Sequence, residues 1–244
     1  MTVVTSDDSR RASASAIKDA LRQRGDAGRA GQQKRYLKSE LDFLGVNVPD
    51  LRTVVRTVVK AAVRTEQDVI ALADELWDDQ VFEHRLAAVE VLKAKTALLT
   101  DHDLPFIERL IRQAAGWALV DPLSGDIAGR IALTHQGAWR DIDRWATDAD
   151  FWIRRSALLA LLSGIRSNRP DTTRFEKYAV PMLAEKEFFI RKAIGWVLRE
   201  LSKHDPGYVA TFTGRHLKQM SGVTFREAIR RLPEADAERL AKQR

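Results

Sequence analysis

The sequence contains no cysteine, few turn-forming residues (13 glycines and 7 prolines among 244 residues) and no long apolar run. Without cysteine, the chain can form neither a disulfide framework nor a thiolate metal site. The longest apolar stretch, residues 156–165, is far shorter than the roughly 20 residues that cross a membrane. Residues 1–11 lack the apolar segment of a secretory signal. We therefore expect a soluble cytoplasmic protein with no membrane partner.

Charge of one sign is in modest excess. The chain has 40 Lys and Arg against 34 Asp and Glu, a formal net charge of +6, and a pI near 9.7. This surplus permits a polyanionic partner without requiring one. Hydrophobic residues make up 45% and charged residues 30%, which is enough for a sizeable core under a solvated surface and excludes disorder over most of the length.

Apolar residues recur at helical spacing along most of the chain. In residues 49–64, Leu51, Val54, Val55 and Val58 follow at intervals of three and four, as one face of an amphipathic helix requires. We expect further helices over residues 67–77, 104–114, 151–162 and 189–201, and no strand is predicted. Residues 1–11 are expected to be a disordered tail, and residues 25–31 a loop.

One pattern occurs three times: an aromatic residue, Arg three positions later, Ala after two more and Leu after five more. It begins at Phe82, Trp152 and Phe188, and the spacing places a missing copy near 117, where Trp117 stands. A unit of about 35 residues accommodates two helices and a turn. The sequence therefore predicts an all-α fold, an α-solenoid of HEAT-like helical pairs forming a single domain over residues 12–244.

The copy at Trp117 departs from the pattern, because Val120 and Asp121 follow and Pro122 replaces the alanine. Proline is costly inside a helix, so we expect the helix to restart near Asp121 or Pro122. Such departures tend to mark functional or strained sites, although a loop variant without consequence fits equally well. In a continuous helix Asp121 shares a face with Trp117 and can stabilise a cation there. Taken alone, a capping role for Asp121 is favoured.

A stripe of positive charge runs along one predicted helix. Arg52, Arg56, Lys60 and Arg64 follow at steps of four, and only Asp68, beyond the end, is acidic at a matching position. A solvated face usually mixes both signs, whereas an unpaired row suits a phosphate backbone. Both interpretations stay open.

The six tryptophans are mainly expected in the core. This is the default for Trp117 and Trp152, which hold equivalent repeat positions, whereas the repeat explains Trp196 least. Arg155 shares a repeat position with Arg85 and Arg191, which favours a structural salt bridge. Histidine spacing and the absence of nucleotide-binding motifs predict no metal and no cofactor.

Several segments together resemble the AlkD-like alkylpurine DNA glycosylases, a DNA alkylation repair family built from HEAT-like repeats. The resemblance covers about residues 33–206. Its order and spacing rest on RYLKSELDFLGVNVPDLR (35–52), ELWDDQVFEHRLAAVEVL (75–92), GWALVD (116–121), FWIRRSALLALL (151–162) and KEFFIRKAIGWVLRELSK (186–203).

The resemblance implies a concave face that binds duplex DNA, and it assigns roles to individual residues. Asp121 corresponds to the catalytic aspartate and Trp117 to its aromatic partner, which replaces the capping interpretation. The active-site arginine is Arg155, which follows Trp152. A second tryptophan platform is Trp196, and Tyr36 lies at the cleft wall. Gly116 stands where the family has another aromatic residue.

The implied activity is hydrolysis of the N-glycosidic bond of cationic N3- or N7-alkylated purines in duplex DNA, a step of base excision repair. Asp121 would stabilise the oxocarbenium-like sugar and position water, Trp117 and Trp196 would attract the cationic base, and Arg155 would hold a phosphate. We expect a monomer that needs no cofactor and is associated with the nucleoid if bacterial. A HEAT-like protein that binds DNA structures without chemistry is the alternative, and a protein-binding scaffold is a third.

Overall fold

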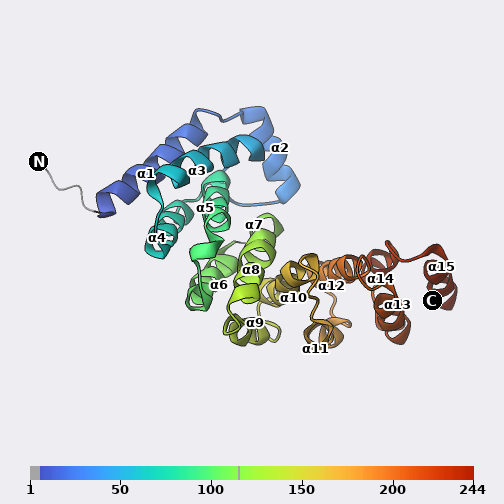
Figure 1. The fold of residues 1–244 in the computed structure, drawn as a ribbon. Helices are drawn as coiled ribbons and strands as arrows, with labels where there is room; N and C mark the ends of the chain where they lie inside the picture. Colours follow the sequence, from blue (N-terminus) through green and yellow to red (C-terminus); the bar gives the residue numbers. More distant parts are fainter. Residues whose placement is uncertain (1–5, 115) are drawn as a thin grey trace, which may run out of the picture. The chain divides into compact units, whose positions relative to one another are not determined.

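The computed structural model describes residues 6–114 and 116–244, and helices make up most of this part of the chain (Figure 1). The only β-pairing among the described residues is an isolated bridge between Asp42 and Val81. The predicted all-α fold is therefore confirmed. No helix in the described ranges is long and apolar enough to span a bilayer.

The chain divides into two compact units. Unit 1 comprises residues 1–103 and 113–123, and unit 2 comprises residues 104–112 and 124–244. The single domain predicted over residues 12–244 stays a prediction.

Unit 1 is built around helices that pack in pairs, α4 with α5 and α1 with α3. A short helix, α7, packs on α5. The α-helices are α1 (Ser6–Arg22), α2 (Ala27–Leu37), α3 (Val48–Ala62), α4 (Glu66–Trp77), α5 (Phe82–Ala94) and α7 (Trp117–Asp121), with short 3-10 helices at Thr96–Leu98 and Asp101–Asp103.

Two local predictions for the beginning of the chain differ from the structure. Residues 1–5 of the predicted tail lie outside the described residues, but α1 begins at Ser6, within that tail. Its apolar stripe of Ala14, Ile17 and Leu21 is buried, and packing of this stripe on α3 and α4 stabilises the helix. The predicted loop over residues 25–31 is wrong from Ala27 onward. Asp26 caps α2 by accepting a hydrogen bond from the Arg29 amide at 2.7 Å, so Gly28 and Gly31 lie in this helix.

Unit 2 has two rows of helices. In the first row, neighbouring helices pack on each other, α8 on α10, α10 on α12 and α12 on α14. Each helix of the second row pairs with one of the first row, α9 with α8, α11 with α10 and α13 with α12. The helices are α6 (Leu104–Gln113), a π-helix (Pro122–Ala128), α8 (Gly129–Thr134), α9 (Ala138–Trp145), α10 (Phe151–Arg166), α11 (Thr172–Met182), α12 (Phe188–Leu201), α13 (Pro206–Arg215), α14 (Gly222–Ile229) and α15 (Glu234–Gln243). This pairing confirms the predicted helical-pair repeats.

Carboxylates connect the second row of helices from one repeat to the next. Glu108 of α6 accepts a hydrogen bond from Trp145 Nε1 of α9 at 2.8 Å and binds Arg144. The same arrangement recurs where Asp143 binds Tyr178 and Arg174, and where Glu176 binds Tyr208 and Arg215. Each carboxylate thereby satisfies the polar end of an aromatic residue in the next helix. These contacts join successive repeats at a spacing close to the predicted period.

Small residues allow helices of the first row to lie close to one another. A Cβ atom at Gly129 would lie only 2.4 Å from the carbonyl oxygen of Ala160 on α10, so only glycine fits there. The Ser124 hydroxyl donates to Ser156 Oγ, and the Ser163 hydroxyl donates to the Gly125 carbonyl, both at 2.7 Å. The π-helix and α8 are therefore held tightly against α10.

Candidate functional site

The residues predicted for the site are divided between the two units. Unit 1 contains Tyr36, Trp117, Asp121 and the basic stripe of α3, whereas unit 2 contains Trp152, Arg155 and Trp196.

Trp117 and Asp121 are the first and last residues of α7, so they lie one turn apart on the same side of the helix. The predicted restart near Asp121 or Pro122 is wrong. The chain stays helical to Thr134, first as a π-helix and then as α8. Pro122 lacks an N–H for the α-helical ladder, and the wider π-helix begins at this residue. Asp121 thus lies within helical backbone rather than before a new helix, in a setting that is frequent at functional sites.

The indole ring of Trp117 is partly exposed to solvent. The ring of Tyr36, whose side chain is 73% exposed, meets Trp117 edge-on with 6.0 Å between centroids. Beside Trp117 lies a small hollow, and a Cβ atom added at Gly116 would meet nothing nearer than a carbonyl oxygen at 4.0 Å. The hollow is lined by Leu37, Ser39, Phe82, Ala114, Gly116 and residues 117–119. An accessible aromatic surface therefore lies one helical turn from a carboxylate.

Glu83 of α5 holds the loop that follows α2. Its side chain is almost fully buried and accepts hydrogen bonds from the backbone amides of residues 44–46 at 2.9, 2.7 and 3.1 Å. Arg29 of α2 donates to the Gly45 carbonyl at 2.8 Å. Because α2 carries Tyr36, Glu83 helps to position that ring. Sequence reasoning missed Glu83, since a single glutamate in a helix gives no signal of its own.

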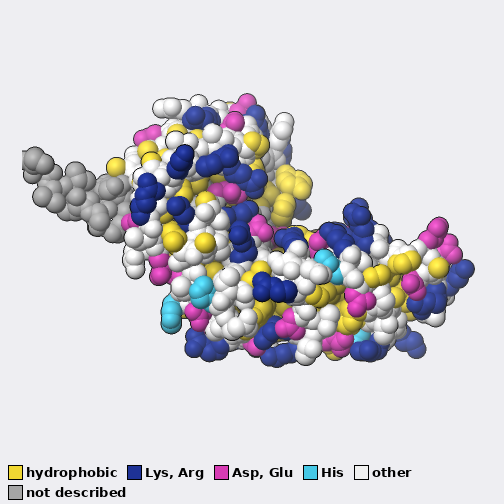
Figure 2. Space-filling view, viewed as in Figure 1, with side chains coloured by type: hydrophobic (Ala, Val, Ile, Leu, Met, Phe, Trp, Pro, Cys, Tyr) yellow, Lys and Arg dark blue, Asp and Glu magenta, His cyan; other side chains and the backbone are white. Residues whose placement is uncertain are grey.

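The basic stripe is only partly unpaired. Arg52 forms a 3.1 Å ion pair with Glu90 of α5, and Arg64 donates to backbone carbonyls at the end of α3. Arg56 and Lys60, in the middle, are exposed and form no ion pair with any described residue. Lys and Arg side chains are frequent on the face of unit 1 that carries α1 and α3 (Figure 2). Of the four cations in the row, Arg52 is therefore the one that pairs with an acidic side chain of the described residues.

The structure corrects the repeat position of Arg155. Arg85 and Arg191 each donate from Nε to the carbonyl oxygen six residues earlier, at 2.9 and 2.7 Å. On α10 the equivalent contact is made by Arg154, whose Nη1 donates to the Asp148 carbonyl, six residues earlier, at 2.6 Å, and which also pairs with Glu185. Since α10 begins at Phe151, the pattern there is shifted by one residue. Arg154 is therefore the counterpart of the two structural arginines in this contact.

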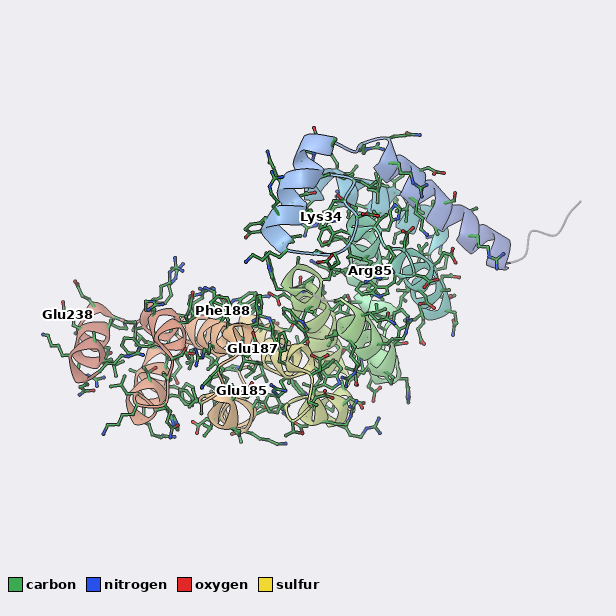
Figure 3. The ribbon with its side chains drawn as sticks, turned by 180° about the vertical axis from the view of Figure 1, so that it is seen from behind. Lys34, Arg85, Glu185, Glu187, Phe188 and Glu238 are labelled. Carbon is green, nitrogen blue, oxygen red and sulfur yellow. The ribbon has the colours of Figure 1, made fainter. Side chains whose placement is uncertain are left out.

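Arg155 instead lies among aromatic rings. It is 2% exposed, donates to the carbonyl oxygen of Phe189 on α12, and has its guanidinium carbon 5.8 Å from the Phe189 ring centre. Trp152 packs on the same ring, with 4.8 Å between centroids. Phe188, the first residue of α12, is 52% exposed beside them (Figure 3). The aromatic cluster thereby fixes where the guanidinium lies.

Trp196 is half-buried on α12. The guanidinium of Arg166 lies 6.0 Å from its ring centre and pairs with Asp126 at 3.6 Å. A cation from the protein thus already faces this indole. Among the described residues, no group of three or more His, Asp or Glu side chains is arranged to hold a metal ion.

Comparison with known proteins identifies the family. Residues 17–232 match the family model described as DNA alkylation repair enzyme. The chain belongs to this family. A solved structure with the same fold is a predicted DNA alkylation repair enzyme from Enterococcus faecalis, with a TM-score of 0.77 and 19% identity over 86% of this chain and 98% of that one. No curated protein gives a match.

Family membership confirms the resemblance seen in the sequence. It gives the chain a role in the repair of alkylation damage, with DNA as the partner. At 19% identity, the likeness to the solved structure shows the shared fold alone.

Proposed function

We propose that this chain is a DNA glycosylase that hydrolyses the N-glycosidic bond of cationic N3- or N7-alkylated purines in duplex DNA and so starts base excision repair. The observation that carries the proposal is the pair of Trp117 and Asp121, one turn apart on α7 with an accessible aromatic surface. The family of DNA alkylation repair enzymes supplies the context.

The chemistry needs one carboxylate. Alkylation at N3 or N7 places a positive charge on the purine, so the base accepts the electron pair of the breaking C1′–N bond and leaves neutral. The positive charge passes to the sugar as an oxocarbenium-like ion. Asp121 stabilises this ion and orients a water molecule, whose oxygen bonds to C1′ and whose proton passes to the carboxylate or to solvent. No general acid is required.

The other residues bind and orient the DNA. Trp117 presents an indole face to the cationic base, and Tyr36 borders it. Arg155 holds a backbone phosphate once its guanidinium, 2% exposed and bound to the Phe189 carbonyl in the free protein, turns toward the DNA. Trp152 and Trp196 contact the same DNA strand. The stripe of Arg52, Arg56, Lys60 and Arg64 adds attraction for phosphates, mainly through its exposed middle pair.

The test is release of 7-methylguanine or 3-methyladenine from alkylated duplex DNA. We expect Asp121→Asn to reduce the single-turnover rate by about 100-fold or more, because it removes the charge that stabilises the sugar cation. Asp141→Asn, at a half-buried aspartate of α9, is the control and should release base at the wild-type rate. Equal release by wild type and Asp121→Asn would refute the catalytic role of Asp121. Duplex binding by a wild type that releases no base would favour the non-catalytic DNA-binding alternative.

A further inference from the structure

Two cations lie on either side of Trp196. Lys192, Trp196 and Arg199 are spaced by four and three residues along α12, so they share one side of the helix. Glu227 of α14 binds both cations, Lys192 Nζ at 2.5 Å through Oε1 and Arg199 through Oε2. The Glu227 side chain is only 9% exposed, whereas those of Lys192 and Arg199 are 42% and 23% exposed. The carboxylate is thus buried beneath two cations that reach solvent.

Close packing of the two helices fixes this arrangement. A Cβ atom at position 195 would lie 2.6 Å from Glu227 Cβ, so Gly195 allows α14 to approach α12 and brings the carboxylate between the cations. Burial alone raises the pKa of Glu227. The hydrogen bond from Lys192 and the charges of Arg199, Lys192 and Arg230 nevertheless keep it below its ordinary value. Glu227 therefore stays ionised and counts as one negative charge.

Positive charge still exceeds negative charge around Trp196. Lys192, Arg199 and Arg230 act on the single carboxylate of Glu227, and Arg166 over the indole is balanced by Asp126. Like charges repel at these distances, so this side of α12 disfavours a cationic base and attracts an anion. Lysine carries three N–H donors and arginine five, so the bonds to Glu227 do not exhaust either residue.

We propose that Lys192 and Arg199 each bind a phosphodiester of the DNA backbone, one on either side of a sugar that packs against Trp196, with Glu227 as the positioning residue. An indole between two cations on one helix side matches the alternation of sugar and phosphate along a strand. The inference rests on the proposed function, because it takes duplex DNA as the substrate. It assigns Trp196 to the backbone rather than to the alkylated base.

The experiment measures binding of an undamaged duplex by fluorescence anisotropy across a salt series. Each phosphate contact contributes about 0.9 to the slope of log K against log salt. Lys192→Gln and Arg199→Gln should each lower this slope by about that amount. Lys177→Gln and Arg215→Gln are matched controls, because each cation also binds a carboxylate but lies on α11 or α13 of the second row. Their slopes should equal that of the wild type.

Two further variants separate positioning and folding from charge. Glu227→Gln raises the net charge by one, yet loss of the fixed cation positions should lower the slope. The triple variant Lys192→Gln, Arg199→Gln, Glu227→Gln leaves no buried carboxylate without a partner. It should lower the slope by about 1.8 while its circular dichroism spectrum stays that of a folded helical protein.

The possible failures are distinguishable. If the single and triple variants keep the wild-type slope while the wild type binds DNA and releases alkylated base, this inference is wrong and the proposed function stands. If the wild type binds no duplex at any salt concentration, both fail together.

Discussion

At the residue scale, Asp121 and Arg155 show how far local sequence patterns reach. The broken repeat pattern singled out Asp121, but its local chemistry favoured a cap. The structure has helical backbone there, because the chain continues through Pro122 as a π-helix. The repeat pattern pointed to Arg155, but it is Arg154, one residue earlier, whose guanidinium donates to the carbonyl oxygen six residues before it, as Arg85 and Arg191 do. When two arginines are adjacent in the sequence, the sequence alone does not show which of them holds the repeat position.

Loss of the buried Glu83 carboxylate should strongly destabilise unit 1. Glu83→Ala leaves three backbone amides of residues 44–46 without their acceptor, and each buried unsatisfied group costs about 1–3 kcal/mol. We expect the free energy of unfolding in urea to fall by about 3 kcal/mol or more. Glu75→Ala, at an exposed position of α4, should change it little. If the two variants unfold at the same urea concentration, Glu83 does not hold the loop.

At the scale of elements, helix positions were predictable mainly from the apolar spacing that each helix carries, and some helices also carry a side-chain cap. The helices over residues 49–64 and 151–162 correspond to α3 and α10, and Asp150 caps α10 by accepting from the Trp152 amide at 2.8 Å. The beginning of α2 was not predicted, because the glycines of residues 25–31 suggested a loop, although Asp26 caps the helix there. Close approaches between helices were also invisible, because they join residues far apart in the chain.

The contact between α8 and α10 should not tolerate a methyl group at Gly129. In Gly129→Ala the added Cβ atom would lie 2.4 Å from the Ala160 carbonyl oxygen. Moving one helix away should cost about 1–3 kcal/mol and lower the melting temperature. Gly207→Ala is the control, because its Cβ atom would meet only Asp205 Oδ1 at 3.5 Å, and it should be neutral or slightly stabilising. A melting temperature for Gly129→Ala equal to that of Gly207→Ala would contradict the close packing.

At the scale of the whole molecule, half-buried carboxylates beside cations connect successive repeats of unit 2. Burial alone raises the pKa of Glu108 and Asp143. Hydrogen bonds from Arg144 and Arg174, and from the neighbouring Trp145 and Tyr178, lower it overall. Folded-state pKa values below the ordinary 4.5 for Glu and 3.8 for Asp mean that the ionised forms stabilise the folded protein.

Acid should therefore destabilise the protein in two stages. Burial lowers the pKa of His84 below its ordinary 6.5, so its contribution to stability is complete above pH 6.5 and declines as the pH falls. The carboxylate contribution is complete above about pH 4.5 and is lost as the pH falls through the lowered folded-state pKa values. Urea unfolding between pH 7 and 3 measures both stages.

Glu108→Gln isolates one carboxylate of this network. It should lower the free energy of unfolding at pH 7 by about 1–3 kcal/mol and flatten the dependence between pH 5 and 3. Glu238→Gln, at an exposed carboxylate of α15, is the control and should follow the wild type. A Glu108→Gln protein with the full wild-type acid dependence would show that this network does not link stability to pH.

Patterns along the chain were enough to predict the all-α class, the places of most helices, the repeat period of about 35 residues and the segments typical of DNA alkylation repair enzymes. These properties depend on neighbours within a turn or two of helix, or on the order of segments along the chain. Folding in three dimensions brings Arg52 to Glu90, places Glu83 under residues 44–46, and sets Glu227 between Lys192 and Arg199 beside Trp196. Each of these contacts joins residues about 28–39 positions apart, and only the packing of one helix on another brings such residues within hydrogen-bonding distance.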